Sequence, residues 1–300
     1  MSNDGLKLPF TGERFTPECV REMAYEHWHR YAWVLPWVSG LDVLDVASGE
    51  GYGTALLAQR AHSVVGVDVD EASVAHAQQR YPLSNGEFRH ADALALPLDD
   101  QSVDAVVCFE TIEHLSDHDG LIAEFKRVLK PHGWLALSSP DKASYSDQTG
   151  FDNPHHVKEL YRDELEQLLT GHFGAHRLLA QKLAFVSAIY PVGVEHDSAP
   201  ESGQWVVKGP TGCTHHTEPP YPPQYFLALA ADEPEHLPGG LALNLFSDQE
   251  ESVYAHYHEE IRHHIHVGAV LAEKDAQIEA LTQRQRLPWW RRWWWPGGGD

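Results

Sequence analysis

Between Leu41 and Asp141 the chain alternates short apolar runs, rich in β-branched residues, with segments whose apolar residues recur at helical spacing. The runs predict strands, and the segments between them predict helices. Strands that alternate with helices in this order favour a parallel, doubly wound α/β sheet with helices on both faces. The strand candidates are residues 41–46, 64–69, 86–92, 103–109 and 133–139.

Two more apolar runs, at residues 176–190 and 224–232, extend this prediction to a Rossmann-like, mostly parallel sheet of seven strands within residues 41–235. Residues 1–40 predict an N-terminal helical cap over the sheet edge or the ligand site. Residues 191–223 are rich in Pro, Gly, Ser, His and Thr, which is typical of a long inserted loop.

The C-terminal part differs from the rest of the chain. Residues 248–286 are polar and favour a helix, with a weak apolar seam at Val267, Leu271, Ile278 and Leu281. A coiled coil that makes oligomers and an ordinary surface helix both fit this pattern. Residues 287–300 hold five of the ten tryptophans beside two arginines. They predict either a disordered tail or a segment that contacts a membrane surface or an apolar groove of a partner.

Composition excludes several classes of protein. The 22 basic and 44 acidic residues give a formal charge of −22, which argues against a nucleic-acid binder, because such a protein needs a cationic surface. Cys19, Cys108 and Cys213 form no CxxC pair, so we expect neither a disulfide framework nor a zinc knuckle. No apolar stretch reaches the roughly 18 residues that span a bilayer. We therefore expect a soluble, cytoplasmic protein, with membrane association through the tail as the alternative.

The segment from Val43 to Ala58, VLDVASGEGYGTALLA, predicts a buried strand, a glycine-rich turn and a helix. Such a turn lets backbone approach a nucleotide-like ligand. The dinucleotide fingerprint GxGxxG would need glycine or alanine at position 54, where Thr54 stands. Asp45, at the end of the strand, would also repel a pyrophosphate. Both features disfavour NAD.

These residues resemble a known family. DVASGEGYG is similar to motif I of the class I S-adenosylmethionine (SAM)-dependent methyltransferases, an acidic residue followed by three alternating glycines, with Ala47 in place of the first glycine. The second strand, FRHADALALP and FKRVLKPHGWLALSSPD follow in the family's order, so the resemblance covers about residues 10–232. It implies SAM as the cofactor.

The resemblance also implies which residues bind SAM. Asp68, followed by Val69, would accept both ribose hydroxyls, and Asp92 would meet the adenine amino group with Ala93 beside the ring. The remaining cofactor candidates are Asp45, Ala47, Ser48, Gly49, Gly51, Gly53, Glu110 and Arg30. Each acidic residue has a structural alternative, since strand-end aspartates also cap helices and turns. Arg30 could equally pair with surface carboxylates.

FTGERFTPE near the start and NPHHVKEL at residues 153–160 are similar to bacterial methyltransferases found with cell-surface polysaccharide and glycosyltransferase systems. His156 stands at the recurring position of the second motif. A histidine suits the removal of a proton from an alcohol acceptor. His156 is therefore the first candidate base and His155 and His114 the second, with a structural role at a helix start as the alternative for His156.

We expect no metal site, because methyl transfer needs no metal and the 21 histidines include no HExxH signature. The predicted function is O-methylation of a saccharide or cell-envelope polysaccharide precursor. The enzymatic alternative is a small-molecule acceptor such as a quinone or secondary metabolite. Another alternative is a non-catalytic SAM-binding scaffold whose tail recruits a glycosyltransferase or the membrane. An NAD-dependent epimerase would need a Tyr-x-x-x-Lys pair, which is missing after the fourth strand.

Overall fold

The computed structural model describes residues 15–17, 19, 22–189, 205–210, 212–240 and 242–286. The chain divides into two compact units, Met1–Phe246 and Ser247–Asp300. The predicted Trp-rich tail and most of the FTGERFTPE motif lie outside the described residues.

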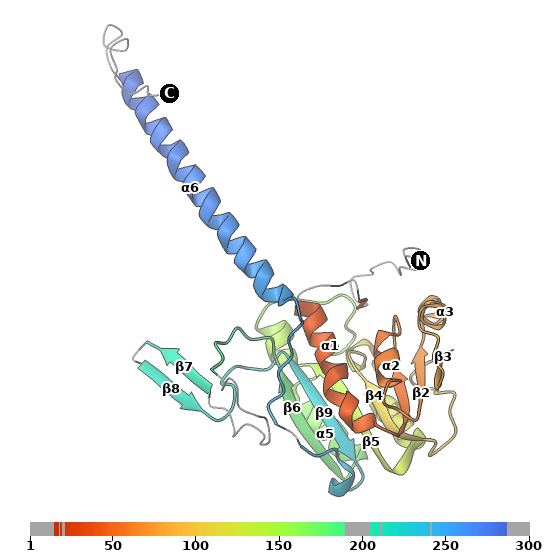
Figure 1. Cartoon of the computed structure of the whole chain (residues 1–300). Helices are drawn as coiled ribbons and strands as arrows, with labels where there is room; N and C mark the ends of the chain where they lie inside the picture. Colours follow the sequence, from red (N-terminus) through yellow and green to blue (C-terminus); the bar gives the residue numbers. More distant parts are fainter. Residues whose placement is uncertain are drawn as a thin grey trace. The chain divides into compact units, whose positions relative to one another are not determined.

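The first unit is built on a seven-stranded sheet in the order β3-β2-β1-β4-β5-β9-β6, as the α/β prediction requires (Figure 1). Strands β1 to β5 pair in parallel, and β9 runs antiparallel to both β5 and β6. The predicted fold, a Rossmann-like and mostly parallel sheet, is therefore confirmed. The strands are β1 Asp42–Val46, β2 Ser63–Asp68, β3 Gly86–His90, β4 Val103–Cys108, β5 Leu129–Pro140, β6 Ala175–Gln181 and β9 Tyr225–Ala231.

The sixth strand is shorter than predicted. We expected a strand over residues 176–190, but β6 ends at Gln181, which pairs with Tyr225 at the start of β9. Pro222 and Pro223 precede β9, and proline has no N–H to donate to a ladder. β9 therefore offers no pairing partner beyond Gln181, and residues 182–189 have no regular structure.

Helices cover both faces of the sheet, and each face has its own buried core. One core includes residues of α4 and α5, and the other includes residues of α1 and α2 (Figure 1). The helices are α1 Glu22–Val34, α2 Tyr52–Leu57, α3 Glu71–Arg80, α4 His118–Val128 and α5 Arg162–His172, with single turns η1 Leu35–Val38, η2 Ile112–His114, η3 Ala143–Asp147 and η4 Pro234–His236.

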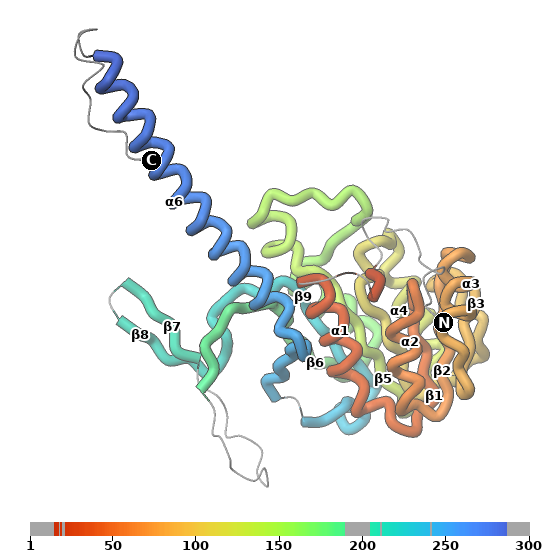
Figure 2. Tube along the Cα trace, turned by 45° about the horizontal axis from the view of Figure 1, so that its top comes forward, coloured from red at the N-terminus to blue at the C-terminus, as the bar shows by residue number. Residues whose placement is uncertain are grey.

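The segment predicted as a loop over residues 191–223 contains a β-hairpin in its described part. Strands β7 (Trp205–Gly209) and β8 (Gly212–His216) pair antiparallel and form a separate two-stranded sheet (Figure 2). Residues 191–204 lie outside the described residues.

The described part of the second unit contains one long helix, α6 (Ser252–Arg286), of 35 residues. The four apolar residues of its predicted seam, Val267, Leu271, Ile278 and Leu281, are all exposed. Self-association through this seam stays a prediction. Among the described helices, none combines the length and hydropathy that crossing a membrane requires.

Candidate active site

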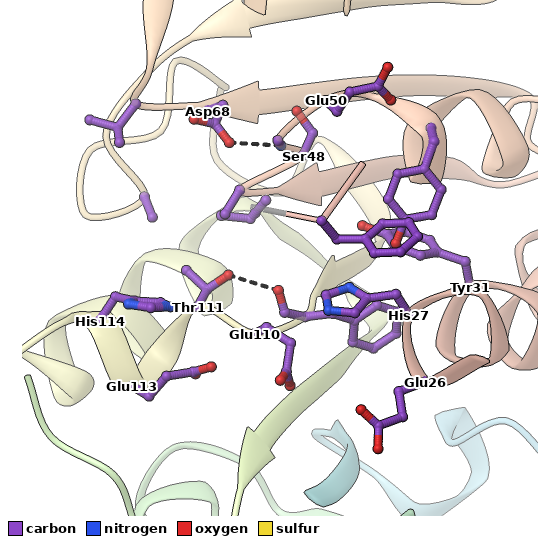
Figure 3. A pocket seen from close by; sticks show the side chains of 18 of the residues that line it. Glu26, His27, Tyr31, Ser48, Glu50, Asp68, Glu110, Thr111, Glu113 and His114 are labelled. Atoms are coloured by element: carbon purple, nitrogen blue, oxygen red, sulfur yellow. Dashed lines mark hydrogen bonds between the residues drawn. The ribbon is translucent and has the colours of Figure 1, made fainter. Parts of the chain in front are cut away.

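A cavity of about 1110 Å³ opens at the carboxyl ends of β1, β2, β3 and β4, with α1 as a further wall (Figure 3). Ligands of open α/β sheets bind at this edge, near the point where the strand order reverses. Here the reversal lies between β1 and β4. The topology therefore brings the glycine-rich turn, the acid after β2 and the loop after β4 to one site.

The glycine-rich turn lies on the floor of the cavity, but only part of it faces the space. Ala47, Ser48 and Gly49 line the cavity, whereas Gly51 and Gly53 do not. A Cβ at Gly51 would lie 2.7 Å from the Cβ of Ala77, so this glycine permits close packing of α3. Gly53 has the corresponding role toward Tyr31, whose ring atoms would lie 2.1–2.6 Å from an added Cβ.

Ala47 has a φ of +56°, a left-handed conformation that an L side chain adopts at a cost of roughly 1–2 kcal/mol. This is the position at which the motif usually has glycine. The backbone N–H of Ser48 donates to the carbonyl of Val67 at 2.9 Å, so the strained turn is fixed against β2.

Asp68 ends β2 with its carboxylate at the cavity wall. One oxygen accepts the N–H of Gly49 at 2.7 Å, and the other accepts the N–H of Asp70 at 2.9 Å. Val69, the next residue, lines the cavity and is 69% exposed. The carboxylate is thus oriented by two backbone donors and presented to a ligand on the glycine turn.

Asp45 does not line the cavity. Its carboxylate is fully buried and accepts hydrogen bonds from Tyr31 Oη at 3.0 Å and Thr54 Oγ1 at 2.5 Å. Burial raises the pKa of Asp45 to about 7. The contacts are those of a residue that holds the glycine turn from behind, which is a structural role of the kind that the sequence left open for the acidic residues.

Asp92 and Ala93 follow β3 and line the same side of the cavity. Asp92 Oδ1 accepts the N–H of Leu94 at 2.9 Å, which holds the turn after the strand. The structure therefore brings Asp68, Val69, Asp92 and Ala93 together with the cavity-facing part of the glycine turn.

Glu110 lies across the cavity from Asp68 (Figure 3). It has a φ of +50°, and Ser138 Oγ both accepts its N–H at 2.8 Å and donates to its carboxylate at 2.7 Å. Arg30, in contrast, is not brought into the cavity. It is fully buried behind Glu110, with Nη2 3.5 Å from that carboxylate, Nε bonded to Gln181 at 2.8 Å and the guanidinium over the Tyr225 ring.

Two of the three predicted catalytic histidines line the cavity, namely His114 and His156. His155 is exposed and outside it, and its carbonyl accepts a hydrogen bond from His114 Nδ1 at 3.0 Å. Both ring nitrogens of His156 are engaged, Nδ1 with Glu159 at 2.6 Å and Nε2 with Asn153 at 3.0 Å. Two side chains of the NPHHVKEL motif therefore bind the two ring nitrogens of its central histidine, His156.

Several cavity residues were not identified from the sequence. Glu26 of α1 lines the cavity, and burial raises its pKa to about 7. Tyr52 also lines it, 6% exposed, and its hydroxyl has no hydrogen-bond partner within the described part of the chain. For Glu26, the only indication in the sequence was that the N-terminal cap was expected to lie over the ligand site. For Tyr52 there was no indication, because it stands at a variable position of the glycine motif.

These features fit the cofactor that the resemblance implies. Ser48 is 3% exposed, lines the cavity, and its Oγ also lacks a hydrogen-bond partner among the described residues. A buried hydroxyl without a partner costs free energy unless a ligand satisfies it. The described lining includes seven carboxylates and neither lysine nor arginine, which suits a cationic ligand without phosphate.

Comparisons with known proteins find methyltransferases among the proteins that this chain is similar to. A family model described as "Methyltransferase domain" matches residues 44–137. Proteins named as probable S-adenosylmethionine-dependent methyltransferases of Mycolicibacterium smegmatis and Mycobacterium tuberculosis are each 42% identical over 167 residues, 54% of this chain. The match covers 63% and 60% of those proteins, so the chain spans less than two thirds of the curated relatives.

A ubiquinone biosynthesis O-methyltransferase of Leptothrix cholodnii is 36% identical over 107 residues, 34% of this chain and 45% of that protein. The crystal structure of a SAM-dependent methyltransferase from Archaeoglobus fulgidus superposes with a TM-score of 0.50 at 17% identity. The superposition covers 70% of this chain and 94% of that one, and it shows a similar fold.

Proposed function

We propose that this chain, whose residues 44–137 match a methyltransferase domain, is a class I enzyme that transfers the methyl group of SAM to a hydroxyl group of an acceptor. The observation that carries the proposal is the position of Asp68. Its carboxylate, fixed by two backbone N–H groups, faces the cavity beside the glycine turn. A carboxylate in that place accepts the two hydroxyls of a ribose through charge-assisted hydrogen bonds.

The position of Asp68 also suggests which part of SAM each of the other cavity residues binds. When bound, SAM supplies an electrophilic methyl group on a positively charged sulfur. In this proposal Ser48 Oγ and the Gly49 backbone hold its polar end, and Asp92 with Ala93 holds the adenine. The acidic wall favours the positive charge of the donor. Positioning of this kind accounts for much of the acceleration in a bimolecular transfer.

We propose a saccharide or related cell-envelope precursor as the acceptor. The wall across from Asp68 carries the carboxylates of Glu26, Glu110 and Glu113 (Figure 3). Carboxylates accept hydrogen bonds from hydroxyl groups and offer no donor when ionised. The aromatic rings of Tyr145 and Tyr225 line the same cavity. A polyhydroxylated ligand with apolar ring faces suits such a lining.

The acceptor hydroxyl must also lose its proton. Of the predicted bases His156, His155 and His114, the first and last line the cavity. Glu26 is a further candidate, because a carboxyl group with a pKa near 7 is well matched to take a proton at neutral pH. We propose Glu26 for this role, since both nitrogens of His156 already bind neighbouring side chains.

A quinol acceptor is the second candidate, favoured by the similarity to the ubiquinone biosynthesis O-methyltransferase. Recruitment of a glycosyltransferase or a membrane surface through residues 248–300 also remains a proposal. The test is methyl transfer from radiolabelled SAM to two acceptor panels, neutral oligosaccharides and quinols. Label in an oligosaccharide is the expected result. Label only in a quinol would replace the proposed acceptor, and SAM binding without transfer to either panel would favour the scaffold.

A further inference from the structure

Three side chains suited to metal binding gather on one side of the cavity. Glu113 and His114 belong to η2, and His156 comes from the loop before α5. One carboxylate oxygen and one nitrogen of each ring all lie within 4.8 Å of one another. Figure 3 shows Glu113 and His114 across the cavity from Asp68. Metal–nitrogen and metal–oxygen bonds are about 2.0–2.2 Å long, so two ligand atoms of one ion lie at most about 4.4 Å apart. Small movements of the side chains would bring these three atoms into that range.

We propose that Glu113, His114 and His156 bind a divalent transition-metal ion, such as zinc or manganese, whose remaining coordination positions open into the cavity. Two imidazole nitrogens and one carboxylate oxygen form a donor set for such ions, and three protein ligands leave positions for water or substrate.

The hydrogen bonds around the two histidines direct the same nitrogen of each ring toward the ion. His114 Nδ1 contacts the carbonyl oxygen of His155, which can only accept, so Nδ1 carries the hydrogen. His156 Nδ1 contacts the carboxylate of Glu159 at 2.6 Å and likewise donates. In the neutral ring Nε2 then carries the lone pair. Metal-binding histidines are held in this way, by a carbonyl or carboxylate on the other nitrogen.

The backbone fixes the two ligand segments to each other. The N–H groups of Val157 and Lys158 both donate to the carbonyl of Glu113, at 2.8 and 3.0 Å. The ring of His156 packs edge-on against the ring of His114, with centroids 5.1 Å apart. These contacts hold the two ligand segments side by side before any ion arrives, which reduces the entropy lost on binding.

The charge of the cavity favours a cation. Its described lining contains seven carboxylates and neither lysine nor arginine. Glu113 is only 1% exposed, and a buried carboxylate is stabilised by a nearby positive charge. The amide of Asn153 opposes binding, because it donates to His156 Nε2 at 3.0 Å. A metal ion must displace this amide, so we expect weaker binding than at a structural zinc site.

The part that the ion plays rests on the proposed function, whereas its binding does not. Its open positions would take neighbouring hydroxyl oxygens of a saccharide acceptor and lower the pKa of the coordinated hydroxyl. His114 and His156 would then be ligands, and Glu26 would remain the proton acceptor.

The test is calorimetric titration of the full chain, stripped of metal with a chelator, with zinc chloride at pH 7.5. Helix α6 carries five histidines, which are also potential zinc ligands, so the number of zinc equivalents decides the question. Glu113→Gln and His114→Ala should each bind one equivalent fewer than the wild type. The matched control is His155→Ala, which removes a neighbouring ring but keeps the carbonyl that orients His114, and should bind as many as the wild type.

Circular dichroism of each variant separates unfolding from ligand loss, and the two ligand variants check each other. Equal zinc counts in wild type, Glu113→Gln and His114→Ala would overturn the metal site, as would the loss of an equivalent in His155→Ala alone. A SAM titration of the same wild-type sample reports on the proposed function separately. A metal site without SAM binding would leave this inference standing and remove the proposed function.

Discussion

Gly53 gives a quantitative test of what the glycine motif does. An alanine there would place its Cβ 2.1–2.6 Å from the ring of Tyr31, closer than real Cβ contacts come. The ring cannot easily move, because it is buried between Tyr52 and Phe109 and its hydroxyl donates to Asp45. Overpacking a core costs about 1–3 kcal/mol.

Displacing Tyr31 also loses its hydrogen bond to the Asp45 carboxylate, worth roughly 1.5–3 kcal/mol. Alanine recovers about 1 kcal/mol of helix propensity within α2. The clash prevails, and we expect Gly53→Ala to lower the free energy of unfolding by about 2–5 kcal/mol. For a domain of this size that lowers Tm by roughly 5–15 °C.

The assay is urea denaturation followed by circular dichroism at pH 8, in a double-mutant cycle with Tyr31→Ala. In the Tyr31→Ala background the clash is gone, so Gly53→Ala should cost nothing or stabilise by up to about 1 kcal/mol. Gly171→Ala in α5 is the matched control, because nothing lies within 4 Å of its added Cβ. An equal cost of Gly53→Ala in both backgrounds would refute the packing role.

Two further predictions concern Glu26 and the C-terminal unit. Burial raises the pKa of Glu26 from 4.5 to about 7, so its protonated form stabilises the fold at low pH and this contribution is lost as pH rises toward 7. Relative to Glu26→Gln, the wild type should therefore lose about 3 kcal/mol of its free energy of unfolding between pH 4.5 and pH 8. Urea titration at each pH measures this difference. Curves of unfolding free energy against pH that run parallel for the two proteins would contradict the raised pKa of Glu26. Removing residues 247–300 should change the SAM dissociation constant, measured by calorimetry, by no more than about twofold. The reason is that every described cavity residue belongs to the first unit. A larger loss of SAM affinity would place part of the site in α6.

The sequence predicted the sheet because its strands are buried runs of β-branched residues separated by amphipathic helices. The same periodicity placed Asp68 and Asp92, since a residue directly after a parallel strand must lie at the ligand edge of the sheet. The end of β6 could not be predicted in this way. The early end of β6 depends on prolines before β9, about 40 residues along the chain.

Side chains placed by tertiary packing could not be predicted in this way. Arg30 was expected to reach SAM, but its orientation is set by Gln181 and Tyr225, residues more than 150 positions away. Glu26 enters the cavity from the same helix for the same reason. For the NPHHVKEL motif, the sequence favoured His156 over His155, and Asn153 and Glu159 give the physical reason that this position is the buried one.

The central claim is that SAM binds on the glycine turn against Asp68. Calorimetric titration with SAM and with NAD, on wild type, Asp68→Ala and the control Asp70→Ala, tests it most directly. Asp70 is two residues away and caps α3 outside the cavity lining.

The account predicts one SAM per wild-type chain, no NAD, near wild-type affinity in Asp70→Ala, and at least about tenfold weaker SAM binding in Asp68→Ala, since a charge-assisted hydrogen bond is worth roughly 1.5–3 kcal/mol. Binding of NAD, absence of SAM binding, or unchanged SAM affinity in Asp68→Ala would contradict it.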